Sequence, residues 1–160
     1  MPERRVISDY VKSLLIEEIV NRCPLCGKFE GTVERFTNHH INHDPSQSEY
    51  WNLMRICPDC HSEIEKFKND GQRDRKLWQV KRALFRNLVG AAGYDILLMA
   101  HVHGTTSSLR GLARTLLKMD LVTIEQENSM TVGMATKHAT ISAFGITERG
   151  KELVEKLKLN

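Results

Sequence analysis

The sequence predicts an α+β protein built from two small domains. Its 160 residues are too few for a large multi-domain enzyme but suffice for one compact domain or two small ones. The first half carries two C-x-x-C pairs among helical patterns, and the second half combines helical patterns with two segments typical of strands. With 41% hydrophobic and 27% charged residues, the composition is that of a soluble globular protein and excludes disordered and collagen-like chains.

The N-terminal segment, residues 1–22, is predicted to contain a helix over residues 8–20. Ser8 or Asp9 precedes its apolar positions and suits the N-cap. The apolar side chains recur at helical spacing, at Tyr10, Val11, Leu14, Leu15 and Ile19. We expect this helix to pack on the module that follows.

All four cysteines fall in two pairs, Cys23 with Cys26 and Cys57 with Cys60. In an intracellular chain, two such pairs 30 residues apart indicate one tetrahedral zinc site. The alternative, a redox dithiol, is less favoured because thioredoxin-type sites carry one pair. The module, residues 23–72, is too small for a sizeable core, so zinc is expected to stabilise it by about 10 to 16 kcal/mol.

A basic helix is predicted over residues 73–89. This segment has six basic residues and one acidic residue, a net +5, whereas the whole chain carries only +3. Apolar residues mark one helical face, and Arg75, Lys76, Arg82 and Arg86 lie largely off it. Concentrated positive charge attracts phosphate, which makes these four residues candidates for DNA binding. The alternative is a solvated helix face.

Residues 90–160 are predicted to form the second domain. Gly-Ala-Ala-Gly at residues 90–93 is typical of a helix stop and a short linker. The elements expected after it are helices over residues 94–102 and 105–119, strands over residues 121–126 and 139–146, and a closing helix that begins near Thr147.

Four thiolates complete the coordination of a structural zinc, so three nearby histidines are not needed as zinc ligands. His39 and His40 form a doublet between the cysteine pairs, and His61 directly follows Cys60. Surplus histidines beside a rigid metal site favour a second, catalytic metal. The alternative is that the doublet is a surface feature or a spare zinc ligand. His43 is expected to be an ordinary loop residue.

The order C-x-x-C, His-His, Asn52, then C-x-x-C-His resembles the HNH endonucleases over residues 23 to about 70. That resemblance implies a ββα-metal motif, with His40 as general base and with His39 and His61 as ligands of a catalytic divalent cation. It implies that Asn52 positions the loop and orients His40. Many relatives have Asp at the position of His39, so a His there favours softer transition metals alongside Mg²⁺, such as Mn²⁺, Ni²⁺ or Zn²⁺. Glu65, four residues after His61, is a third ligand, a hydrogen-bond acceptor for one of the ligands or, as we favour, a solvated surface residue.

The second domain, in its order of helices, two strands and Ile-Thr-x-x-Gly-x-x-Leu from residue 146, resembles winged helix-turn-helix domains. That resemblance implies DNA binding. In the predicted helix over residues 105–119, Arg110, Arg114 and Lys118 recur every four residues and form one basic stripe. Domains of this kind also serve in dimerisation or protein docking, which remains open.

Together these features predict a metal-dependent DNA endonuclease that hydrolyses phosphodiester bonds with a structural Zn²⁺ and a catalytic Mg²⁺, Mn²⁺ or other divalent cation. The alternative function is a non-catalytic zinc-binding transcriptional regulator. We expect DNA as the partner, with RNA less favoured and a homodimer possible. The apolar runs are shorter than the roughly 20 residues that cross a bilayer, so we expect no membrane partner and a cytoplasmic location.

Overall fold

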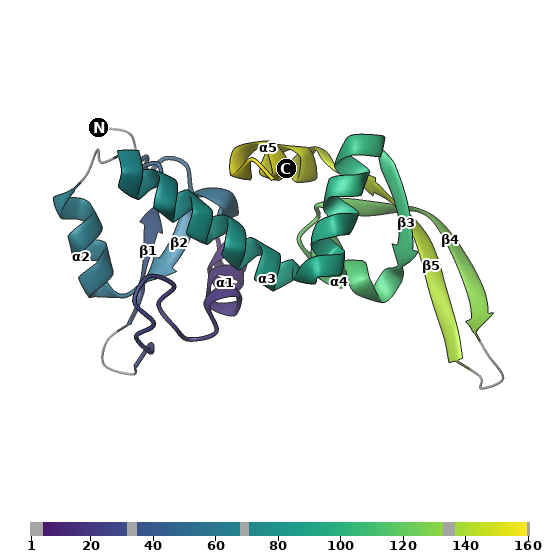
Figure 1. The fold of residues 1–160 in the computed structure, drawn as a ribbon, viewed down its shortest axis with the longest axis horizontal. Coiled ribbons are helices and arrows are strands. Elements are labelled where there is room, and N and C mark those ends of the chain that lie inside the picture. The colour runs from purple at the N-terminus through teal and green to yellow at the C-terminus, as the bar shows by residue number, and fades with distance from the viewer. Residues whose placement is uncertain (1–4, 32–34, 68–70, 133–136, 160) are drawn as a thin grey trace. The chain divides into compact units, whose positions relative to one another are not determined.

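The computed structural model describes residues 5–31, 35–67, 71–132 and 137–159 (Figure 1). The chain divides into two compact units, residues 1–85 and 86–160. The division falls within one long helix, α3 (Gly71–His103). The fold is mixed helix and sheet, which agrees with the predicted α+β class.

The first unit begins with α1 (Asp9–Ile19), which confirms the predicted N-terminal helix. The Ser8 side chain caps it by accepting a hydrogen bond from the backbone N–H of Val11 at 3.2 Å. The helix ends where Val20 adopts a left-handed conformation, with φ 48°. Leu14 and Leu15 are fully buried, so this helix contributes directly to the core of the first unit.

A hairpin and a helix follow, in the order that a ββα motif requires. β1 (Thr37–His40) pairs antiparallel with β2 (Leu53–Ile56), and η1 (Tyr50–Asn52), a short 3-10 helix, leads into β2. α2 (Pro58–Lys66) begins directly after β2, with proline in its first turn, where a missing N–H costs nothing. The apolar side chains beneath these elements include Ile41, Met54, Ile56 and Ile64.

α3 consists of two helical segments that meet at a kink at Gly90, so the predicted helix stop is confirmed there. The predicted linker over residues 90–93 is too long, because the second helical segment resumes directly after Gly90 and includes the helix predicted over residues 94–102. Only Gly90 leaves the helical conformation, with φ 73° and ψ 164°. The helix resumes because the alanines that follow Gly90 are the strongest helix formers and impose no turn of their own.

The length and composition of α3 also satisfy a simple test for a membrane span. Core helices of soluble proteins satisfy the same test, so it is weak evidence for a membrane. The absence of a membrane partner stays a prediction.

A buried ion pair joins α1 to α3 in the first unit. Lys81 Nζ lies 2.8 and 2.9 Å from the two carboxylate oxygens of Glu18, and both side chains are fully buried. Tyr50 contacts both members of the pair. Its hydroxyl donates a hydrogen bond to Glu18 at 2.5 Å, and its ring centroid lies 3.6 Å from Lys81 Nζ. Burial raises the pKa of Glu18 and lowers that of Lys81, and their mutual attraction opposes both shifts.

Replacing Lys81 by methionine is expected to lower the free energy of unfolding by about 3 to 5 kcal/mol, because the Glu18 carboxylate would remain buried without its counter-charge. Urea denaturation measures the change. The double variant Glu18→Leu/Lys81→Met is expected to recover much of the loss. Lys76→Met, at an exposed position of the same helix, is the control and should change stability by less than about 0.5 kcal/mol. Equal losses in Lys81→Met and Lys76→Met would contradict this prediction.

The second unit contains a three-stranded antiparallel sheet in the order β3-β5-β4. Its strands are β3 (Thr105–Leu109), β4 (Val122–Val132) and β5 (Lys137–Ile146), with β5 in the centre (Figure 1). α5 (Glu148–Leu157) closes the chain, and the Thr147 side chain caps it by accepting from Gly150 N at 3.0 Å. The two predicted strands and the closing helix are confirmed.

The predicted helix over residues 105–119 is wrong in its first two thirds. β3 occupies its start, η2 (Arg110–Ala113) is a 3-10 turn, and only α4 (Arg114–Lys118) is α-helical. The β-branched Thr105 and Thr106 favour an extended backbone, and β5 pairs with this segment, with Thr105 opposite Gly145. Arg110 therefore does not share one α-helix with Arg114 and Lys118. The winged-helix interpretation of this unit stays a prediction.

Candidate metal centres and active site

The four cysteines converge on one point, as predicted. Cys23 and Cys26 lie on the turn after α1, where Gly27 adopts φ 77°, and Cys57 and Cys60 lie at the start of α2. All four sulfur atoms lie within 4.8 Å of one another, and the Sγ atoms of Cys26 and Cys57 are 3.7 Å apart. Tetrahedral zinc with Zn–S distances of about 2.3 Å would separate its sulfurs by about 3.8 Å. The cluster therefore fits a metal such as zinc.

The surroundings of these thiols suit a structural metal. Burial acts to raise the pKa of Cys23, but backbone hydrogen bonds at Cys57, Leu25 and Cys26 outweigh it and lower the pKa to about 7. Burial raises the pKa of Cys57 and Cys60. A bound metal would displace the protons that these two thiols otherwise keep, so metal binding and folding are coupled.

A second cluster lies between β1 and α2. His39 on β1 and His61 and Glu65 on α2 place one possible ligand atom each within 4.8 Å of the others. The imidazoles of His39 and His61 meet edge to face with centroids 5.3 Å apart, and His39 Nδ1 lies 3.6 Å from Glu65 Oε1. These residues line a cavity of about 200 Å³ together with His40 and His43. The sequence favours Glu65 as a solvated surface residue. Its side chain is 43% exposed, but it also lies beside His39 and His61, which that interpretation does not anticipate.

The burial and protonation state of His39 suit a metal ligand. It is only 2% exposed, and its Nε2 is buried with no hydrogen-bond partner among the described residues. Burial, followed by the proximity of His43 and His61, lowers the pKa of His39 to about 4, and Glu65 opposes this shift. At neutral pH the ring is therefore uncharged and keeps a lone pair. Two imidazoles and a carboxylate form a donor set that suits a divalent transition metal or a harder ion with water completing its shell.

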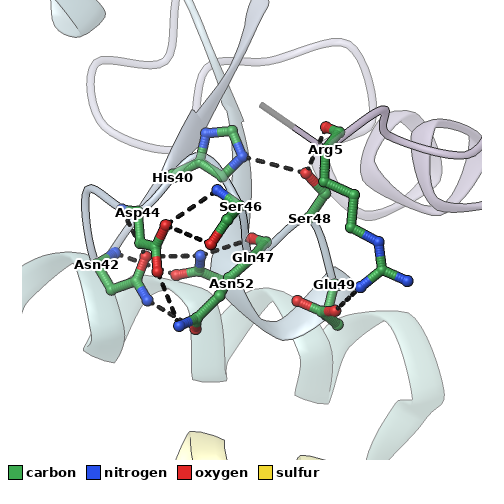
Figure 2. A network of polar contacts seen from close by, with 9 residues as sticks. All are labelled: Arg5, His40, Asn42, Asp44, Ser46, Gln47, Ser48, Glu49 and Asn52. Atoms are coloured by element: carbon green, nitrogen blue, oxygen red, sulfur yellow. Dashed lines mark hydrogen bonds and ion pairs between the residues drawn. The ribbon is translucent and has the colours of Figure 1, made fainter. Parts of the chain in front are cut away.

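His40 and Asn52 lie on either side of the loop that joins β1 to β2 (Figure 2). Asn52 is fully buried, and its side-chain amide donates to Asn42 Oδ1 at 2.7 Å and to the Gln47 carbonyl at 2.8 Å. Its Oδ1 accepts from the Asn42 N–H at 3.1 Å. His40 Nε2 lies 3.4 Å from the Oγ of Ser48 on the same loop. Asn52 thus holds the loop against which His40 rests.

His43 lies in the loop after β1, as predicted, and the structure also places it against this cavity, which was not predicted. Its ring meets that of His39 edge to face at 5.3 Å, and its Nε2 lies 3.4 Å from Asp74 Oδ1. A left-handed backbone at His43, with φ 59°, accompanies the turn that follows β1. The sequence signal was the concentration of three histidines within five residues.

The predicted DNA-binding residues are spread over both units. On α3, Arg75 and Lys76 are exposed, Arg82 is partly buried, and Arg86 is exposed with its guanidinium 5.3 Å from the ring centre of Tyr94. In the second unit, Arg114 and Lys118 are exposed on α4. Arg110 forms an ion pair with Glu127 of β4 at 2.9 Å, which offsets part of its positive charge.

Comparison with known proteins finds a family match for part of the first unit. No curated protein and no solved structure matches the chain. Residues 23–67, however, match the family model of the HNH endonuclease. The matched segment includes all four cysteines, both members of the histidine doublet and the three residues Asn52, His61 and Glu65. Residues 23–67 are therefore similar to an HNH endonuclease domain.

Proposed function

We propose that the protein is a metal-dependent DNA endonuclease that hydrolyses phosphodiester bonds. The observation that carries the proposal is the cluster of His39, His61 and Glu65 beside His40, inside a segment that matches the HNH endonuclease family. Members of that family are usually nucleases that act on DNA. The cysteine cluster, with zinc bound, would hold the hairpin and α2 in place.

His39, His61 and Glu65 would hold the catalytic divalent cation, which is Mg²⁺, Mn²⁺ or another divalent cation. Such a cation supplies positive charge that stabilises the extra negative charge at phosphorus during hydrolysis. The two histidines reach it from different elements, β1 and α2, so its position depends on the packing of the helix on the hairpin. Glu65 would add a negatively charged oxygen ligand one helical turn after His61.

His40 would act as the general base that removes a proton from the attacking water. A neutral imidazole accepts a proton near physiological pH, where a lysine would mostly be protonated already. The hydrogen bonds of Asn52 support its predicted role, because they hold the loop that contacts His40.

The basic residues would hold the DNA backbone. Arg75, Lys76, Arg82 and Arg86 on α3 lie outside the metal cluster and are candidates for phosphate contacts, as are Arg114 and Lys118 on α4. Arg110 is expected to contribute less because its ion pair with Glu127 already offsets part of its positive charge. Each phosphate contact should add about −0.9 to the slope of log binding constant against log salt concentration. A winged-helix-like second domain and a homodimer belong to this proposal.

Replacing Glu65 by glutamine is expected to raise the metal concentration needed for half-maximal cleavage by about 10- to 100-fold, since an amide oxygen carries no negative charge. Titration of Mn²⁺ in a cleavage assay measures the shift. Glu63→Gln is the matched control, because Glu63 lies on the same helix with a 65% exposed side chain that pairs with Arg73. An equal shift in both variants would remove Glu65 from the proposed ligand set.

Cleavage of end-labelled duplex, single-stranded and branched DNA across Mg²⁺, Mn²⁺, Ni²⁺ and Zn²⁺ tests the proposed function directly. We expect cleavage that requires a divalent cation and that stops when EDTA is added. Sequence-specific DNA binding without cleavage in any of these metals would instead support the zinc-binding regulator. Metal analysis supplies a second criterion, because the nuclease predicts one tightly held zinc and one labile divalent site per chain.

A further inference from the structure

Ser48 makes two contacts that together restrict the chemistry of His40. It is buried, at 7% exposure, in the loop between β1 and β2. Its Oγ lies 2.9 Å from the backbone carbonyl oxygen of Arg5 and 3.4 Å from Nε2 of His40 (Figure 2). The first distance is that of a good hydrogen bond, and the second is long enough to indicate a weaker one.

A serine hydroxyl has one hydrogen, and a carbonyl oxygen can only accept. The Ser48 hydrogen therefore goes to Arg5, so Ser48 can meet His40 only through an oxygen lone pair. A neutral His40 that contacts this lone pair carries its hydrogen on Nε2 and keeps its own lone pair on Nδ1. We propose that Ser48 is a positioning residue that holds His40 in this tautomer and ring orientation.

The carbonyl of Arg5 is well placed to hold the Ser48 hydroxyl in one direction. The Arg5 N–H donates to the carbonyl of Pro45 at 3.1 Å, and its guanidinium pairs with Glu49 Oε1 at 2.7 Å. Both partners belong to the loop that carries Ser48. The segment at Arg5 is thus bound to the loop on either side of the serine, and a rotation of the hydroxyl toward His40 would break its hydrogen bond to the Arg5 carbonyl.

For catalysis, the inference rests on the proposed function of His40. A general base needs its lone pair on the nitrogen that faces the proton to be removed, and an imidazole in the other tautomer presents a hydrogen there instead. Ser48 would raise the fraction of the competent tautomer without touching the substrate. Its loss should then lower kcat and leave KM nearly unchanged.

The tautomer of His40 can be determined without an activity assay. Nitrogen-15 NMR at about pH 8.5, above the usual imidazole pKa of about 6.5, separates the hydrogen-bearing nitrogen from the one with the lone pair. The signals of His40 are identified by their loss in His40→Ala. In the wild type we expect the hydrogen on Nε2, and in Ser48→Ala we expect both nitrogen shifts to move toward the tautomer-averaged values of a free imidazole.

Cleavage assays supply the second readout. Ser48→Ala should lower kcat by about tenfold, the factor that corresponds to one lost hydrogen bond, with KM changed less than about twofold. Ser48→Thr keeps a hydroxyl and should restore both the nitrogen shifts and kcat. Ser46→Ala is the matched control, because its hydroxyl bonds Asp44 at 2.6 Å in the same loop and should leave the His40 shifts unaltered.

Three results would overturn the inference: a wild-type His40 with its hydrogen on Nδ1, unchanged shifts in Ser48→Ala, or equal effects of Ser48→Ala and Ser46→Ala. A failure of the proposed function looks different. A wild type that cleaves no DNA, or a His40→Ala variant that cleaves normally, would refute the role of His40 as base, while the shifts would still decide the role of Ser48.

Discussion

The variant His40→Ala is expected to lower kcat for DNA cleavage by about 10²- to 10⁴-fold, the usual contribution of a positioned general base. Its fold should persist, because His40 is only partly buried and makes no contribution to the cysteine cluster. Divalent-cation affinity should stay within about threefold of the wild type, since His39, His61 and Glu65 remain. Single-turnover cleavage with saturating Mn²⁺ measures the loss in the chemical step.

The matched control for this variant is His103→Ala, which removes an exposed imidazole at the end of α3 in the second unit. It should cleave as the wild type does. Normal cleavage by His40→Ala, or an equal loss in both variants, would contradict the assignment of His40 as base. A large loss of Mn²⁺ affinity in His40→Ala would instead place His40 among the metal ligands.

Removal of the zinc is expected to unfold the first unit. Structural zinc stabilises small modules by about 10 to 16 kcal/mol, which equals or exceeds the net stability of a typical domain. Cys57 is the ligand to replace because it is fully buried, and Cys57→Ser should abolish stoichiometric zinc binding. The second unit, with its own core around Phe144 and Leu153, should keep its sheet.

The two tryptophans make this loss directly measurable. Both tryptophans of the chain, Trp51 and Trp78, lie in the first unit and stack with ring centroids 6.2 Å apart. Loss of zinc should therefore shift the tryptophan emission to the red, while hydrogen exchange in β5 and α5 stays slow. An unchanged emission spectrum in a protein verified to be free of zinc would contradict the structural role. Ser13→Ala, on the exposed side of α1, is a suitable control.

Several features of the fold follow from local sequence alone. The cap at Ser8 and the apolar spacing after it predict α1, and the turn signals around Thr147 predict α5, because both depend on contacts within one or two helical turns. The cysteine pairs predict their own convergence, since no other arrangement satisfies four thiolates around one ion. These predictions required no knowledge of distant partners.

The helix predicted over residues 105–119 was wrong because the structure of its first part depends on a distant segment of the chain. Its leucines and basic residues do recur at helical spacing, but Leu109 and Leu112 are 45% and 46% exposed. The strand β3 forms there because β5 pairs with it from more than 30 residues away in sequence. A pairing partner at that distance leaves no mark on the local pattern, and so local periodicity was misleading.

The sequence by itself determined the chemistry of this protein: two cysteine pairs, a histidine doublet, Asn52 and His61, in the order of the HNH endonuclease domain. Only the tertiary structure decided which side chains join them. It placed Glu65 and His43 at His39, buried Lys81 against Glu18, and set Ser48 between Arg5 and His40. The reason is physical, since ligand identity depends on residue type, whereas orientation and burial depend on contacts between segments that are far apart in the chain.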